Sequence, residues 1–226
     1  LLPKAYLESI SKAAHDIGAI FVLDCIASGC AWVDMKATGV DILISAPQKG
    51  WSSTPSAGVV MLSNRAIEVV ENSNSNSFAI DLKKWFSIMK TYENGGHAYH
   101  TTMPTDSLTH FRDTMLETQE YGFDKLYKNQ WELGNRVRDL LKSKSIKSVA
   151  ADGFRAPGVV VSYTSDENIH NGLKFKELGM QIAAGVPLMC DEPKSFQTFR
   201  IGLFGLDKLY NVDRTIDKLE KAFDSV

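Results

Sequence analysis

Two short apolar runs constrain the fold more than any other feature of this 226-residue sequence. The run AIFVLD ends in Asp24, and the run DILISA comes shortly before Lys49. Continuous apolar runs of this length are typical of strands covered on both faces, as in parallel sheets. A helical pattern from Pro3 to Gly18 precedes the first run, and a shorter one from Val33 to Thr38 separates the two. The order of strand, helix and strand predicts an α/β sheet.

A third apolar run extends this first unit. GVVMLS follows the loop PQKGWSSTPSAG and predicts another strand, whereas ENSNSNSF predicts a loop. The segment from there through HAYHTTMPTD is rich in aromatic residues, and we expect it to be irregular.

The second half of the chain has a different pattern. A long helix is expected from about Thr105 to Leu141, broken or bent near Gly122 and Gly134. The elements expected after it are the strand PGVVVSYT, the helix IHNGLKFKELGMQI, the strand FRIGLF and a closing helix from Val212 to Phe223. We therefore predict a large domain over residues 1–123, with a mainly parallel sheet, and a smaller α+β domain over residues 124–226.

Composition argues against several classes of function. The net charge of −2 gives no global basic field for nucleic acid. No apolar run reaches the roughly 18 residues of a membrane span. The three cysteines, Cys25, Cys30 and Cys190, lack CxxC spacing, so neither a zinc site nor a disulfide framework is expected. This cysteine usage fits a reducing, cytoplasmic setting.

Asp24 and Lys49 are the first candidates for chemistry. Ligands of parallel sheets lie beyond the carboxyl ends of the strands, and both residues follow such ends. A carboxylate and an amine could therefore meet at one rim of the sheet. On spacing alone, a structural ion pair or two unrelated solvated residues remain the alternatives.

The segments around these residues carry a family resemblance. AIFVLDCIAS and DILISAPQKGWSSTPSAGVVMLS, followed by AYHTTMPTDSL, FKELGMQIAAG and FRIGLFG, resemble class V aminotransferases. These are pyridoxal-phosphate enzymes of fold type I, and the alanine–glyoxylate and serine–pyruvate group is the most similar. The resemblance covers essentially the whole chain, in order.

The resemblance implies roles for residues at the sheet rim. Lys49 would form a Schiff base with the aldehyde of pyridoxal 5′-phosphate and would later move a proton between substrate and cofactor carbons. Asp24 would pair with the pyridine nitrogen and keep it protonated, which makes the ring a better electron sink. Ile26, two residues further in an extended run, would point the same way as Asp24 and pack on the ring, although plain core packing explains it equally well.

Other roles concern the phosphate and the substrate. The resemblance implies that Gln48 helps to hold the phosphate, and that Tyr99 and Thr102 donate to a phosphate across a homodimer interface. An ordinary loop with aromatic packing is the alternative for Tyr99 and Thr102. Arg200 would grip the substrate carboxylate with two parallel hydrogen bonds. A structural salt bridge is the alternative there.

The implied activity is transfer of an amino group from a small amino acid to a 2-oxo acid of the pyruvate or glyoxylate type. Relatives also have an N-terminal half that this sequence does not show, and the chain opens without methionine. We therefore expect a C-terminal portion of a longer protein that is inactive by itself.

Two alternatives to this activity remain open. Cysteine desulfurases share the fold and need a reactive cysteine, for which Cys190 is the only candidate. Its neighbours Asp191 and Glu192 disfavour a thiolate, and such enzymes usually have histidine where Gln48 stands. The other alternative is a dimerising remnant of the fold that has lost catalysis.

Overall fold

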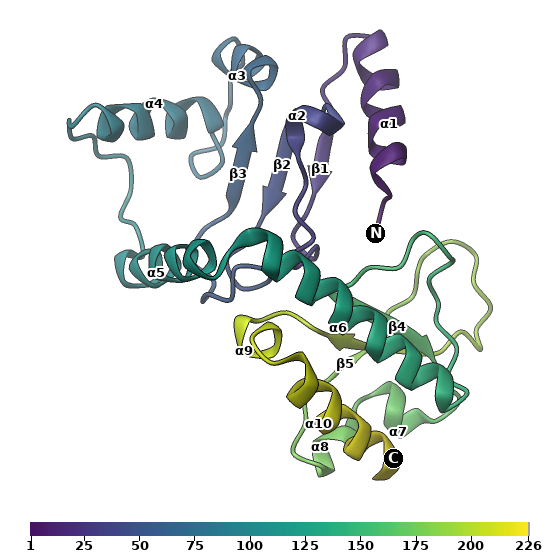
Figure 1. Ribbon diagram of the computed structural model, residues 1–226. Helices are drawn as coiled ribbons and strands as arrows, with labels where there is room; N and C mark the ends of the chain where they lie inside the picture. The colour runs from purple at the N-terminus through teal and green to yellow at the C-terminus, as the bar shows by residue number, and fades with distance from the viewer. Residues whose placement is uncertain (226) are drawn as a thin grey trace.

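The computed structural model describes residues 1–225 and shows two units, each built on its own three-stranded sheet (Figure 1). The first sheet contains β1 (Val22–Asp24), β2 (Ile42–Ser45) and β3 (Val59–Leu62), in that order. The second contains β4 (Val159–Tyr163), β6 (Thr198–Gly202) and β5 (Ala183–Ala184), with β6 in the centre.

Helices flank both sheets; α5 crosses below the first sheet, and α6 runs along the second unit (Figure 1). The helices of the first unit are α1 (Lys4–Asp16), α2 (Met35–Thr38), α3 (Asn64–Glu71) and α4 (Leu82–Glu93). The remaining helices are α5 (Thr105–Tyr121), α6 (Phe123–Ser143), α7 (Glu167–His170), α8 (Leu173–Glu177), α9 (Leu206–Leu209) and α10 (Val212–Ser225).

In the first sheet, β1 and β2 are parallel, and β3 adds an antiparallel strand next to β2. Leu23 is level with Leu43, and both are buried in one cluster with Leu7 of α1. Successive side chains of a strand point to opposite faces, so Asp24 lies on the face turned away from α1. That face is open in this chain, since Val22 is 48% exposed.

The second sheet is antiparallel throughout. Its strand β4 packs on α6, and the ring of Phe199 in β6 lies 6.3 Å from the ring of Phe223 in α10. Its core is a single apolar cluster whose most deeply buried members include Leu126, Leu133, Val137, Phe175, Phe199 and Leu209. Apolar residues of α6 recur at helical spacing on its inner side, and this places that side against the sheet. The core therefore fixes β6, the strand that carries Arg200, in the middle of the unit.

The predicted long helix is divided only once. Gly122, at φ +102°, separates α5 from α6, and α6 then continues through Gly134 without a break. A break at Gly134 is therefore not present. Glycine is needed there for packing, because a Cβ atom would lie 2.7 Å from the backbone of Pro157.

Two other sequence expectations differ from the structure. The segment expected to be irregular contains α4, whose first turn is capped by Asp81 accepting a hydrogen bond from the Lys84 N–H. The helix predicted over IHNGLKFKELGMQI is instead two short helices, because Gly172 adopts φ +81° between α7 and α8. The boundary predicted between residues 123 and 124 stays a prediction; it falls at the start of α6.

Among residues 1–225, no helix combines the length and the apolar character that crossing a bilayer requires.

Candidate active site

Asp24 and Lys49 both stand at the carboxyl edge of the parallel strands β1 and β2. Asp24 is the last residue of β1 and is level with Ile44 of β2, and Lys49 lies in the turn that follows β2. Adjacent strands are about 4.8 Å apart, so both residues belong to one edge of the parallel pair. One carboxylate oxygen of Asp24 accepts the Ile26 N–H at 2.9 Å, and its other oxygen has no partner among residues 1–225.

Lys49 is half-buried and its amine is not neutralised. Its Nζ lies 5.6 Å from the ring centroid of Phe204, a cation–π distance, and pairs with no carboxylate in the described part of the chain. The ion pair with Asp24 that the spacing allowed is therefore not formed. The amine and the carboxylate are both left for another group.

The turn that carries Lys49 is held firmly. The Ser53 N–H donates to the Pro47 carbonyl at 3.0 Å, which closes the turn around the lysine. Gly50 packs directly against Gly29 in the loop after β1, where a Cβ atom would lie 2.4 Å from the Gly29 oxygen. The backbone on both sides of the lysine is thus tied to the loop that follows Asp24.

Trp51 anchors the far side of the same turn. It is 7% exposed, and its ring lies 5.2 Å from Trp32, 6.0 Å from Phe111 and 6.5 Å from Phe123. These rings come from the loop after β1 and from α5 and α6, so three segments fix the position of the turn. Such packing limits the movement of Lys49 to its side chain.

The cysteines near this edge are unsuited to nucleophilic chemistry. Burial, helped by the charge of Asp24, raises the pKa of the Cys25 thiol to about 11, and burial raises that of Cys30 to about 12. Both are protonated near neutral pH. In the described part of the chain, no group of three His, Cys, Asp or Glu side chains could hold a metal ion.

Arg200 occupies the centre of the second sheet. It is half-buried between Val161 and Ala183 on the neighbouring strands, and its Nε donates to the Ala184 carbonyl at 2.8 Å. No carboxylate of residues 1–225 forms a salt bridge with it. The structural salt bridge considered from the sequence is therefore not present, and the terminal guanidinium nitrogens are free for an anion.

The remaining predicted residues lie in different settings. β1 ends at Asp24 and Ile26 lies in a turn, so the expectation that Ile26 continues an extended run is wrong; the Asp24 carboxylate captures its N–H instead. Gln48 is exposed beside Lys49. Tyr99 and Thr102 are exposed on the connection between α4 and α5, with their hydroxyls 3.4 Å apart. Neither of these two contacts Lys49 or Asp24.

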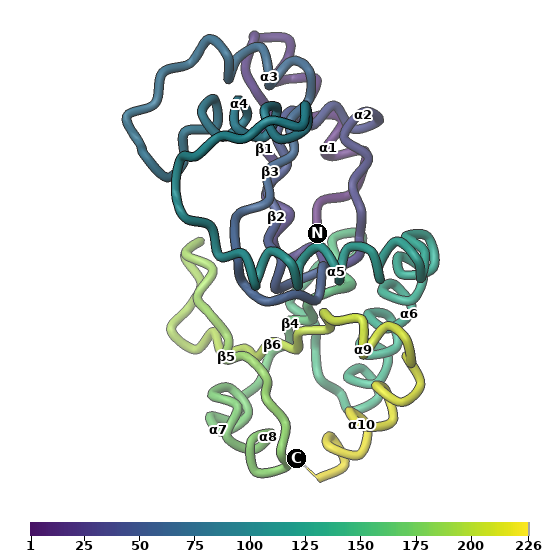
Figure 2. Tube along the Cα trace, turned by 90° about the vertical axis from the view of Figure 1, so that its left-hand side faces the viewer, coloured from purple at the N-terminus to yellow at the C-terminus, as the bar shows by residue number. Residues whose placement is uncertain are grey.

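Cys190 lies on the connection between β5 and β6, which projects from the second unit as a yellow-green loop in Figure 2. The side chain of Glu192 accepts the backbone N–H groups of Cys190 and Met189 at 2.9 and 3.0 Å. These backbone hydrogen bonds, with that of Cys190 the strongest, lower the pKa of Glu192 to about 2. A negatively charged carboxylate therefore lies against the backbone of Cys190 near neutral pH.

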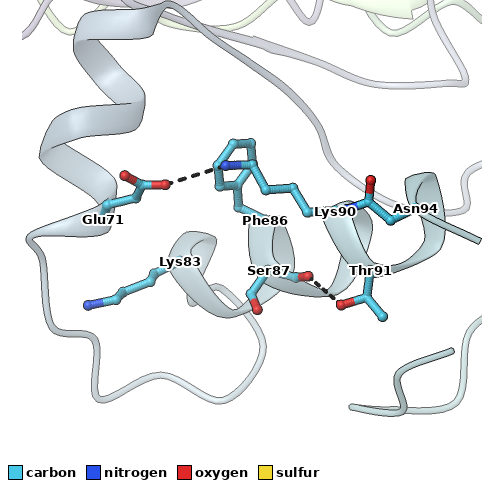
Figure 3. A pocket seen from close by; sticks show the side chains of 7 residues that line it. All are labelled: Glu71, Lys83, Phe86, Ser87, Lys90, Thr91 and Asn94. Carbon is cyan, nitrogen blue, oxygen red and sulfur yellow. Dashed lines mark hydrogen bonds and ion pairs between the residues drawn. The ribbon is translucent and has the colours of Figure 1, made fainter. Parts of the chain in front are cut away.

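Two surface pockets lie away from this edge. One of about 400 Å³, shown in Figure 3, lies over α3 and α4 and contains the ion pair of Glu71 and Lys90, 3.5 Å apart. The other, of about 420 Å³, is an apolar pocket along α5 that includes Trp51 and Phe111. Neither is lined by Asp24, Lys49 or Arg200. The strand edge is the better candidate for an active site, because it carries a carboxylate, Asp24, and an amine, Lys49, that form no ion pair with each other.

Sequence reasoning missed three residues around this edge: Ser52, Gln130 and Phe204. Phe204 stands within the FRIGLFG motif, but its contact with Lys49 depends on how the two units meet. For Ser52 and Gln130 the sequence offers no signal, since their partners lie far away along the chain.

Comparison with known proteins places this geometry in context. The chain is 24% identical over 234 residues to alanine–glyoxylate aminotransferase of Felis catus, covering 96% of this chain and 53% of the relative. It is 23% identical over 219 residues to 2-aminoethylphosphonate–pyruvate transaminase of Vibrio parahaemolyticus, covering 96% and 58%. No protein-family model matches the chain.

Solved structures agree with these sequence relatives. Alanine–glyoxylate aminotransferase from Nostoc superposes with a TM-score of 0.77 at 19% identity, covering 96% of this chain and 57% of that one. This chain is similar in sequence and in fold to aminotransferases. The fold predicted from the sequence, that of the fold type I enzymes, is confirmed.

The aminotransferase relatives are longer than this chain, which spans about half the length of the curated relatives it matches. The fold also occurs in a cysteine desulfurase from Thermococcus onnurineus, with a TM-score of 0.67 at 15% identity and coverage of 97% and 56%. Fold alone therefore does not separate transamination from desulfuration. That distinction depends on the residues of the site.

Proposed function

We propose that this chain carries the reactive lysine of a pyridoxal-phosphate-dependent aminotransferase, which moves an amino group from a small amino acid to a 2-oxo acid. The observation that carries the proposal is the placement of Asp24 and Lys49 at one edge of a parallel strand pair, where neither satisfies the other. The names of the relatives, which include alanine, glyoxylate and pyruvate, support this class of reaction.

The residues present fit pyridoxal phosphate at its two ends. Lys49 offers an unpaired amine that would hold the aldehyde, and Asp24 offers a free carboxylate oxygen for the protonated ring nitrogen. When bound, the cofactor supplies an electron sink for the charge left by loss of a proton from the substrate. Gln48, beside the lysine, would donate to the phosphate.

Lys49 and Arg200 would then act on the substrate itself. The guanidinium of Arg200 would bind the carboxylate and orient the carbon that loses its proton. The Lys49 Nζ, free once substrate has taken its place, would accept that proton and return it at a different carbon. The ring of Phe204 beside the amine would restrict access of water to it.

A homodimer with shared active sites is part of the proposal. Tyr99 and Thr102 are exposed, and neither contacts Lys49 of its own chain. This is expected of residues that serve the active site of a second copy. The apolar pocket along α5, where Leu116 is 55% exposed, supports burial of this surface in an interface. Because the chain matches about half of each relative, we also propose that the site is completed by residues outside it and that residues 1–226 alone are inactive.

A cytoplasmic location is also proposed, from the cysteine usage. Cys25, Cys30 and Cys190 are all free thiols in the structure. Free thiols are typical of proteins from reducing compartments.

The experiment is a donor and acceptor screen of the complete polypeptide in which these residues occur. Serine and 2-aminoethylphosphonate serve as donors with pyruvate or glyoxylate as acceptor, and alanine serves as donor with glyoxylate. Lys49→Ala is compared with Lys83→Ala, a surface lysine of α4. We expect ping-pong kinetics that are abolished by Lys49→Ala and unchanged by Lys83→Ala. Activity that survives Lys49→Ala, or no transamination with any pair, would contradict the proposal.

The same preparation separates the alternatives. A desulfurase would release sulfide from cysteine and lose this activity in Cys190→Ser. A non-catalytic remnant would show no effect of Lys49→Ala on any measured property. Absorbance of bound cofactor in residues 1–226 alone, equal to that of the complete polypeptide, would refute the proposed incompleteness of the site.

A further inference from the structure

Gln130 is a fully buried amide on α6, and its three hydrogen bonds all go to the backbone of other segments. Its Oε1 accepts the N–H of Cys30 at 3.3 Å, in the loop that follows Asp24. Its Nε2 donates to the carbonyl of Pro157 at 3.1 Å and to that of Leu203 at 3.3 Å. One side chain therefore ties the loop after β1 to the segments before β4 and after β6.

The space around this amide is closed by two glycines and an aromatic ring. A Cβ atom on Gly29 would lie 2.6 Å from the Gln130 Oε1, and one on Gly158 would lie 2.8 Å from the ring of Phe204. The same ring is 5.6 Å from the Lys49 Nζ. The loop after β1, the start of β4 and the end of β6 thus meet in one close-packed joint.

A second hydrogen bond fastens the joint to the lysine turn. The Leu206 N–H, two residues beyond Phe204, donates to the Ser52 Oγ at 2.8 Å. Ser52 holds a positive φ of 59°, a conformation that non-glycine residues rarely adopt and that its surroundings must impose. The segment after β6 is therefore held by two hydrogen bonds, from Gln130 to the Leu203 carbonyl and from the Leu206 N–H to Ser52.

We propose that Gln130 is a positioning residue. It fixes the distance between Arg200 on β6 and the strand edge that carries Asp24 and Lys49. This inference rests on the proposed function. Arg200 holds the substrate carboxylate while Lys49 takes the proton, so the two must keep a fixed separation although they belong to different units. A displacement of about 1 Å in such a site costs on the order of 100-fold in rate.

The variants are chosen to break the joint in two places. Gln130→Leu keeps the volume and removes all three hydrogen bonds, and Ser52→Ala removes the acceptor of Leu206 at a half-buried position. The matched control is Gln197→Leu, which removes an amide hydrogen bond to Glu167 just before β6 and outside the joint. All are made in the complete polypeptide.

The first measurement separates positioning from folding. In Gln130→Leu we expect KM for the amino donor and for the 2-oxo acid to rise by about tenfold or more. Absorbance of the bound cofactor should be retained, and Gln197→Leu should match the parent. A purely structural role would lower the melting temperature and leave KM of the folded enzyme unchanged. If Gln130→Leu does not fold, Ser52→Ala tests the proposal instead, and we expect its KM for both substrates to rise as well.

The second measurement does not depend on activity. Cys30 is 1% exposed beside the joint, so its labelling by a small aromatic disulfide, followed by mass spectrometry, reports opening. We expect labelling at least tenfold faster in Gln130→Leu than in the parent and Gln197→Leu. If the parent does not transaminate, the proposed function fails, but the labelling rate of Cys30 still tests whether Gln130 holds the joint closed. Equal labelling rates, or KM values within twofold of the parent in both joint variants, overturn the proposal.

Discussion

Asp41 makes a sharp test of how the first unit is held together. Its side chain, immediately before β2, is 3% exposed, and its carboxylate accepts from His15 Nε2 of α1 at 2.8 Å and from the Phe21 N–H at 2.9 Å. The Ser63 hydroxyl, which also caps α3, donates to it at 3.2 Å, and Arg65 approaches to 3.6 Å. One buried charge therefore joins a helix, both parallel strands and the start of another helix.

The size of the effect follows from these contacts. A hydrogen bond to a charged group is worth about 1.5–3 kcal/mol, and removing one partner of a buried pair costs about 3–5 kcal/mol. In Asp41→Asn one oxygen remains as an acceptor, but the new amide nitrogen faces groups that donate. We therefore expect a loss of about 2–4 kcal/mol in the free energy of unfolding.

The effect should also depend on pH. Burial acts to raise the pKa of Asp41, but the hydrogen bonds from the Phe21 N–H, His15 and Ser63 outweigh it and hold the pKa below its ordinary 3.8. A carboxyl whose pKa is lower in the folded state stabilises above its unfolded pKa, and this stability is lost as pH falls through the folded value. The difference between parent and Asp41→Asn should be full near neutral pH and shrink below about pH 4.

Urea denaturation followed by circular dichroism measures this directly. Asp16→Asn on α1 is the control, because Asp16 forms only an exposed ion pair with Lys12 and should change stability by less than about 1 kcal/mol. Equal stabilities for Asp41→Asn and Asp16→Asn, or a difference that grows on acidification, would refute this reasoning.

Other predictions follow from packing and from the thiols. Gly134→Ala places a Cβ atom 2.7 Å from the backbone two residues before β4, so it should lower the free energy of unfolding by about 1–3 kcal/mol. Gly58→Ala, which meets nothing within 4 Å, should stay within about 0.5 kcal/mol of the parent, and urea denaturation of both variants measures this. At pH 8 a thiol reagent should label exposed Cys190 promptly and leave Cys25 and Cys30 protected, because burial keeps the pKa of the latter two at about 11 and 12. Prompt labelling of two or more thiols in the folded protein would show that these sites are open.

Much of the first sheet could be predicted because its signals are local. The continuous apolar runs that end near Asp24 and Lys49 predict strands directly, and the crossover between them predicts that their ends share one edge. The pattern did not predict α4, whose exposed Met89 and Tyr92 blur its apolar side. The capping signal of Asp81 was available and would have located its start.

The joint around Gln130 could not be predicted in the same way. A buried glutamine resembles a surface glutamine in sequence, and its partners lie 27, 73 and 100 residues away. The glycine at position 134 likewise gave a false signal of a helix break, because its lack of a side chain allows close approach to Pro157. The turn at Ile26 depends on capture of its N–H by Asp24, which periodicity alone does not reveal.

Chemical trapping of the lysine tests the central claim most directly. The complete polypeptide is incubated with pyridoxal phosphate, reduced with borohydride and digested, and the added mass is located by peptide mass spectrometry. The account predicts close to one label for each chain, on Lys49, and a weakened label in Asp24→Asn. A label scattered over surface lysines such as Lys83, with Lys49 unmodified, would contradict it.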